Sequence, residues 1–153
     1  MKSVLLASFL FLLAEYSFAE ELTNYTITSD SQVNTLEGNL EAKGNVVIKS
    51  NSGNFEAYSD MLSYDKEGKF LKLTGNVSIK SNSGNFEAYS DKLSFDKDDK
   101  SLKLLGNVYV KNLESEGIAI EETSGDELII FTDTGLYEFK SQNKNRVTTK
   151  IQF

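Results

Sequence analysis

The sequence predicts an all-β protein, an antiparallel meander of bent strands built from repeats. Residues 44–74 and 75–105 are two copies of a 31-residue unit and match at 24 of 31 positions. Apolar and polar residues alternate along each unit, which is the period of a strand and not of a helix. The chain contains no Pro, which suits uninterrupted ladders of backbone hydrogen bonds. A fixed repeat period predicts a quasi-one-dimensional stack.

The first nineteen residues have the pattern of a secretory signal peptide. Lys2 supplies a positive start, and residues 4–14 form an apolar run that is short for a membrane span. Ser17-Phe18-Ala19 is a small-x-small cleavage site. We expect cleavage after residue 19, which leaves residues 20–153 as a single domain. The alternative is a retained N-terminal anchor.

Composition excludes several classes of function. The chain has no Cys and no His, which removes disulfides, thiolate zinc sites, an acylated N-terminal Cys and the usual general base. We therefore expect no enzyme activity, no cofactor and no metal site. The net charge is −7, and removal of residues 1–19 leaves it unchanged because one basic and one acidic residue are lost. An acidic domain is a poor binder of nucleic acid, whose phosphates require Lys and Arg.

Each unit is expected to contribute two strands and two turns. Leu71, Leu73, Val77 and Ile79 share one parity, so they lie on one face of a strand. Turn-forming residues cluster at 51–54 and 65–68, and at the equivalent positions of the second unit. A diverged third unit opens at residue 106, and a degenerate unit precedes residue 44. The chain therefore predicts an antiparallel meander without a second domain.

The strands are expected to bend where parity changes. Around Ser59-Asp60 the inward parity slips by one residue, as a β-bulge requires. Folding the chain at its turns places Gly75 opposite Ser59, and Gly within a strand commonly marks a bend or bulge. We predict a bend or bulge in every strand, aligned across the sheet, which folds the sheet into a V-shaped trough. A flat sheet at residues 70–80 would contradict this interpretation.

The parity assigns one apolar set of residues to the inside of the trough and leaves Lys, Asp, Glu and Ser outside. The predicted lining is Val46, Ile48, Phe55, Ala57, Leu62, Tyr64, Leu71, Leu73, Val77, Ile79, Phe86, Ala88, Leu93, Phe95, Leu102, Leu104, Val108 and Val110. At the C-terminus, residues 127–131, 134–139 and 147–153 are expected to form further strands, and residues 143–146 a polar turn.

The unit resembles the repeat of the LptA/OstA-like family. The residues that carry the resemblance are Gly44-Asn45-Val46, Ala57, Asp60, Leu62, Tyr64-Asp65 and Leu71, with copies at Gly75-Asn76-Val77, Ala88, Asp91, Leu93, Phe95-Asp96 and Leu102. The resemblance covers residues 25–110 and extends only loosely to the C-terminus. It implies an open, twisted β-jellyroll of bent antiparallel strands.

The same resemblance implies a function and partners. Proteins of this family carry lipopolysaccharide across the Gram-negative periplasm between inner and outer membranes, with acyl chains in the apolar trough. LptA-like members stack head to tail through edge strands and contact LptC-like and LptD-like proteins. In this chain the N-terminal edge near residues 25–33 and the C-terminal strands are the expected contacts. The cleavable signal favours LptA over LptC, and no barrel-sized segment follows as it does in LptD.

Simpler interpretations stand beside the lipid path. The inward residues have the pattern of an ordinary filled core, which would suit an exported structural or adhesive β-repeat protein that binds through its outer face. The absence of exposed aromatic rows favours the lipid path over that alternative. Asp60 and Asp91 are interpreted as caps of their own backbone at a bulge. Residues 96–99 lack the spacing of a calcium loop and are expected to form a solvated turn.

Overall fold

A computed structural model of the chain describes residues 25–50, 55–67, 70–81, 86–96, 98–113, 120–131, 133–134, 136–142 and 145–152. The predicted signal peptide at residues 1–19 lies outside these residues. Within the described ranges, no helix has the length and hydrophobicity needed to cross a bilayer.

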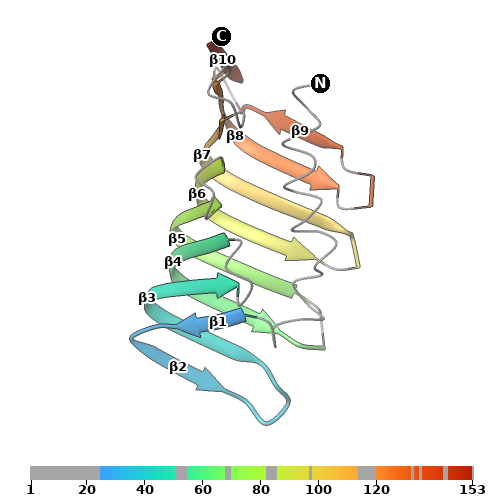
Figure 1. The fold of residues 1–153 in the computed structure, drawn as a ribbon. Helices are drawn as coiled ribbons and strands as arrows, with labels where there is room; N and C mark the ends of the chain where they lie inside the picture. Colours follow the sequence, from blue (N-terminus) through green and yellow to red (C-terminus); the bar gives the residue numbers. More distant parts are fainter. Residues whose placement is uncertain are drawn as a thin grey trace.

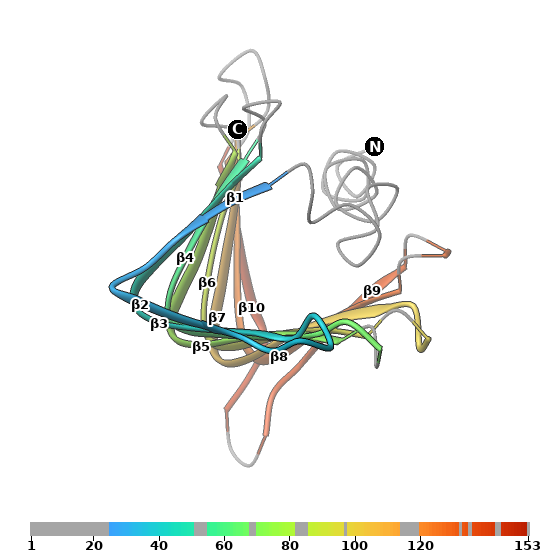
Figure 2. The ribbon, with the colours of Figure 1, turned by 90° about the horizontal axis from the view of Figure 1, so that it is seen from below.

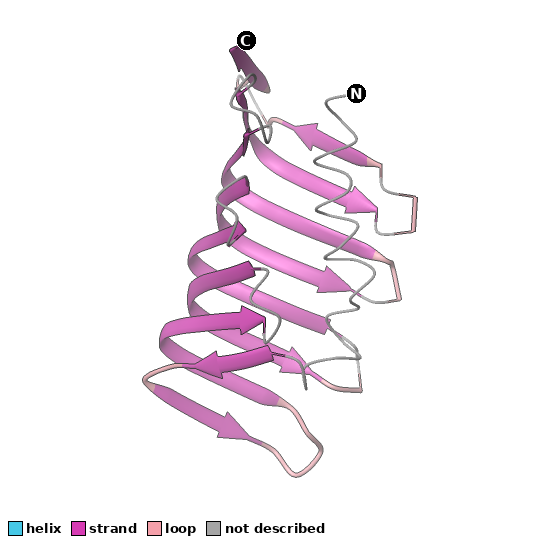
Figure 3. Cartoon of the chain, in the orientation of Figure 1, coloured by secondary structure: helices cyan, strands magenta, loops and turns pink. Residues whose placement is uncertain are grey.

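All of the described regular structure is strand (Figure 3). The strands are β1 (Tyr25–Thr28), β2 (Ser31–Asn34), β3 (Leu40–Ser50), β4 (Phe55–Asp65), β5 (Phe70–Ser81), β6 (Phe86–Asp96), β7 (Ser101–Leu113), β8 (Ile120–Phe131), β9 (Tyr137–Lys140) and β10 (Thr148–Gln152). They form one sheet in the order β1-β3-β4-β5-β6-β7-β8-β10, with β2 also paired to β3 and β9 to β8 (Figure 1). Every pairing is antiparallel, so the predicted open meander is confirmed.

The sheet is folded into a V (Figure 2). One arm, named here the β1–β10 arm, contains β1, β10 and the halves of β3 to β8 that lie between them. The other, the β2–β9 arm, contains β2, β9 and the remaining halves of the same strands. β1 and β2 are successive halves of one bent path along β3, and β9 and β10 are the two halves of the path along β8. The predicted trough is therefore the shape of the sheet.

The bend comes from aligned bulges on alternate strands. Between Met61↔Thr74 and Tyr58↔Ser78, β5 spends one residue more than β4, and the same excess recurs against β6. The extra residue belongs to Gly75-Asn76, and both residues have positive φ, +84° and +48°. The Gly-Asn pairs at 44–45 and 106–107 repeat this geometry. The predicted bulges are thus confirmed for β3, β5 and β7, whereas β4, β6 and β8 follow the bend without an added residue.

The C-terminal strands differ in extent from the prediction. β8 begins at Ile120 and not at residue 127, because its first half pairs with β7 although it carries few apolar side chains. β9 covers Tyr137–Lys140 and β10 covers Thr148–Gln152. Between them, where other strands carry a Gly-Asn pair, the chain inserts residues 141–147.

Candidate functional site

The inner face of the V carries the predicted apolar lining. All of the predicted residues except Phe55 are buried on it, and the side chain of Phe55 lies outside the described residues. The structure adds Ala42, Leu128 and Ile130 to this buried set, with Ile27, Leu40, Tyr137 and Phe139 packed against it. The sequence prediction missed these residues because it followed the two intact units and stopped at residue 110.

Register turns the alternation into continuous rows. Directly paired residues point to the same side of a sheet. On the β2–β9 arm, Leu62, Leu73, Leu93, Leu104 and Leu128 therefore form one row of leucines from β4 to β8. Each buried leucine of this kind contributes about 1.5–3 kcal/mol to folding. The row is also an uninterrupted hydrocarbon strip along the length of the trough.

On the β1–β10 arm, the corresponding row alternates large and small side chains. Ile48, Ala57, Ile79, Ala88 and Val110 follow one another from β3 to β7. The buried polar side chains in the described part of the chain are limited to serines and one threonine, so no charge lies on the inner face there. An arrangement of this composition can solvate hydrocarbon and offers no group for acid–base or metal chemistry.

A hydrogen-bonded clasp holds the bend of each unit. Asp60 Oδ2 accepts a hydrogen bond of 2.9 Å from Asn76 Nδ2 on the next strand, and Asp91 accepts one of the same length from Asn107. The pair Asp30 and Asn45 repeats the contact in the degenerate N-terminal unit. These aspartates were expected to cap their own backbone. Instead the carboxylates join neighbouring strands.

The local cap at the bend comes from serine. Ser59 Oγ donates to the carbonyl oxygen of Met61 at 3.1 Å, and Ser90 Oγ donates to that of Lys92 at 3.0 Å. These two buried hydroxyls are therefore satisfied, which buried polar groups require. At the far end, Asp126 Oδ2 accepts a 2.6 Å hydrogen bond from the backbone N–H of Gln142, so the inserted loop replaces the Gly-Asn pair of earlier strands.

The predicted turn at residues 96–99 is an Asx turn. Asp96 Oδ1 accepts hydrogen bonds from the backbone N–H groups of Asp98 and Asp99, at 2.9 and 3.1 Å. Asp65 forms the equivalent bond with the N–H of Glu67 at 3.1 Å. The carboxylate that opens each turn therefore shapes the backbone of that turn.

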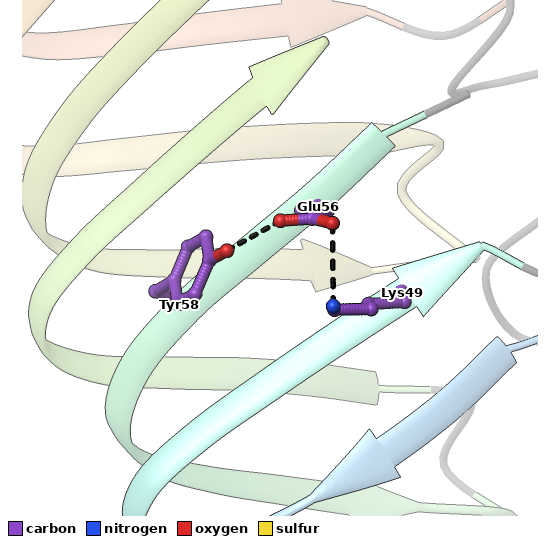
Figure 4. Close-up of polar contacts among 3 residues, drawn as sticks. All are labelled: Lys49, Glu56 and Tyr58. Atoms are coloured by element: carbon purple, nitrogen blue, oxygen red, sulfur yellow. Dashed lines mark hydrogen bonds and ion pairs between the residues drawn. The ribbon is translucent and has the colours of Figure 1, made fainter. Parts of the chain in front are cut away.

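The outer face of the β1–β10 arm carries a row of alternating charge. Register aligns, from β3 to β10, Lys49, Glu56, Lys80, Glu87, Lys111, Glu122 and Lys150. At its start, Lys49 Nζ lies 3.5 Å from Glu56 Oε1, and the Tyr58 hydroxyl donates to the same carboxylate (Figure 4). The Tyr58 hydrogen bond lowers the pKa of Glu56, an effect that desolvation opposes and Lys49 reinforces. The same bond is the main cause of the raised pKa of Tyr58.

Three tyrosines lie beside this row, also on the outer face. Tyr58, Tyr89 and Tyr109 occupy the adjacent register position and are half-buried. The rings of Tyr89 and Tyr109 are 6.0 Å apart, and burial followed by the Glu122 hydrogen bond raises the pKa of Tyr109. The expectation that the chain has no outward aromatic row was therefore wrong. Their alternation with apolar inward residues was present in the sequence, but their alignment depends on register.

The two edges of the sheet differ in charge. β1 and β2 contain no charged residue, although exposed edge strands are usually protected by charge or Pro. β9 carries Glu138 and Lys140, whose charged groups are 3.5 Å apart. Exposed apolar side chains also gather at the edges of the β2–β9 arm. They are Val33 and Leu36 at the N-terminal edge and Phe131 and Leu136 at the C-terminal edge.

Comparison with known proteins places this geometry among solved structures. No family model matches the sequence, and the search of curated proteins finds no significant match. Among solved structures, the chain matches LptH, described as the LptA-homologous periplasmic component of the conserved lipopolysaccharide transport device of Pseudomonas aeruginosa. The TM-score is 0.64 over 84% of this chain and 94% of LptH, at 16% sequence identity.

This chain has the fold of LptH. The match covers nearly all of LptH, so the shared architecture extends well beyond the two near-identical units. The predicted LptA/OstA-like jellyroll is thereby confirmed as the fold.

Proposed function

We propose that this protein binds lipopolysaccharide in the periplasm of a Gram-negative bacterium, with the acyl chains along the inner face of the trough. The observation that carries this proposal is the continuous, uncharged apolar inner face, which runs through β3 to β8 and ends at open edges. The fold of LptH, a periplasmic lipopolysaccharide transport component, supports the same assignment. The role is one of binding and transfer, without catalysis or a cofactor.

The proposal includes export and a bridging role. Residues 1–19 act as a cleaved signal peptide, and residues 20–153 form the periplasmic domain. Copies of the domain join head to tail and connect LptC-like to LptD-like proteins, so that the trough continues between the inner and outer membranes. Strand directions support this contact. β9 runs toward the bend and β2 runs away from it, so the two edges meet antiparallel when one copy follows another.

The test compares binding of lipopolysaccharide with binding of the same molecule after complete removal of its acyl chains. The mature protein is titrated with each, and we expect binding only while the acyl chains are present, because the trough offers hydrocarbon contacts. Leu73→Ser removes one leucine of the inner row and should weaken binding, whereas Lys72→Ser on the exposed outer face is the matched control. Equal binding of the deacylated saccharide would contradict the proposal.

A second candidate is an exported structural or adhesive repeat protein with a filled core. The outward row of Tyr58, Tyr89 and Tyr109 is the observation that favours it. That candidate predicts binding through the outer face, including binding to the deacylated saccharide. Replacement of the three tyrosines by Ser would then abolish binding, whereas the lipid-trough proposal expects binding of intact lipopolysaccharide to persist.

A further inference from the structure

The two units present the same inner surface twice. Each inward residue of β4 and β5 recurs 31 positions later, in β6 and β7. The recurring pairs are Ala57 and Ala88, Leu62 and Leu93, Tyr64 and Phe95, Leu71 and Leu102, Leu73 and Leu104, Val77 and Val108, and Ile79 and Val110. All of these residues are buried in both units.

The backbone that presents these residues also repeats. Leu62 pairs with Leu73 as Leu93 pairs with Leu104, and both units break register at the same point. The bulge glycines Gly75 and Gly106 have φ values of +84° and +79°. Both bends are closed by a 2.9 Å Asp–Asn hydrogen bond. The second unit is therefore a structural copy of the first, moved along the sheet by two strands.

We propose that the trough holds two equivalent acyl-binding positions, one in each unit, about 10 Å apart, which is two strand spacings. This inference rests on the proposed lipid function and adds a mechanism to it. A bound acyl chain that moves by one unit exchanges each protein contact for the same contact. The two positions therefore bind with nearly equal affinity, and neither traps the lipid on its way along the trough.

The remaining differences between the positions are small and local. Val110 lacks one methylene group of Ile79, and Phe95 lacks the hydroxyl of Tyr64. The flanks differ more, because Ala42 lies beside Leu62 where Leu73 lies beside Leu93. One methylene group in a hydrophobic site discriminates by roughly tenfold. We therefore expect occupancies of the two positions that agree within about tenfold.

The test uses the purified protein with photoreactive benzoylphenylalanine in place of Tyr64 or Phe95, irradiated with lipopolysaccharide. Lys72 and Lys103 are the matched outward pair, because they occupy equivalent positions on the opposite face. Circular dichroism establishes that each variant is folded. If a variant at Tyr64 or Phe95 does not fold, the pair Leu73 and Leu104 provides the same comparison.

The expected result is crosslinking from both inward positions, with yields within about tenfold of each other, and little from either outward position. Inward crosslinking from one unit alone, or with a larger difference, overturns the equivalence and leaves the lipid function intact. Absence of crosslinking at both inward positions of folded protein overturns the equivalence and the proposed function together.

Discussion

Gly75→Ala tests whether the bulge glycines create the bend. Gly75 has a φ of +84°, in the left-handed region that L residues with a Cβ avoid. A Cβ at this position would also lie 2.9 Å from both Cβ and Cγ of Asp60. The substituted chain must therefore accept backbone strain and displace the Asp60 side chain, which carries the hydrogen bond to Asn76.

The magnitude follows from these two effects. The left-handed conformation costs an alanine about 1–2 kcal/mol. Loss of the exposed Asp60–Asn76 hydrogen bond adds about 1 kcal/mol. The sum is about 2–3 kcal/mol of unfolding free energy. At roughly 4 °C per kcal/mol for a domain of this size, Tm should fall by about 8–12 °C.

The assay is urea unfolding followed by circular dichroism, with Gly125→Ala as the matched control. Gly125 pairs with Val108 at the position that Ser59 and Ser90 occupy in earlier strands, and its φ is not left-handed. Its new Cβ would lie 3.1 Å from the Lys140 carbonyl oxygen, so we expect a loss below about 1 kcal/mol. If Gly75→Ala is no more destabilising than Gly125→Ala, the assigned role of the bulge is wrong.

Three further predictions concern the outer face and the edge. Lys80→Glu places like charges beside Glu56 and should cost about 0.5–1 kcal/mol, relieved by salt, while Lys72→Glu, whose cross-strand neighbours are serines, should be near neutral in the same unfolding assay. In Tyr58→Phe, the lost stability should be greatest near neutral pH. It should shrink as pH falls through the lowered pKa of Glu56, and again as pH rises above the ordinary tyrosine pKa of about 10 toward the raised pKa of Tyr58; unfolding of both proteins across pH checks this. Val33→Lys charges the exposed β2 edge and should convert assemblies to monomers in analytical ultracentrifugation, whereas unchanged assembly would place the contact elsewhere.

Period-two alternation predicted the inner face because a strand has only two faces. The parity of Leu71 and Leu73 therefore decided their side, and the structure buries both. The bend was also predictable, since glycine recurs where the inward parity slips. Alternation failed at the start of β8, where polar residues pair with β7 and only Thr123 is buried.

Features that depend on register could not be read from one strand. The Asp60–Asn76 clasp joins residues 16 positions apart, and it exists only because the bulge brings the two strands into that alignment. The outward tyrosines illustrate the same limit. Tyr89 and Tyr109 face each other on neighbouring strands, although they lie at different positions of their units. Such contacts require the pairing of strands and not only their pattern.

The most direct test of the central claim is photocrosslinking of lipopolysaccharide to the mature protein from both faces of the sheet. Benzoylphenylalanine replaces inward Phe86 or Leu73, and outward Lys72 or Lys80 in separate variants. We expect crosslinks from the inward positions and none above background from the outward positions. Folded protein that crosslinks from neither inward position, or equally from both faces, would contradict the assignment of the trough as the lipid path.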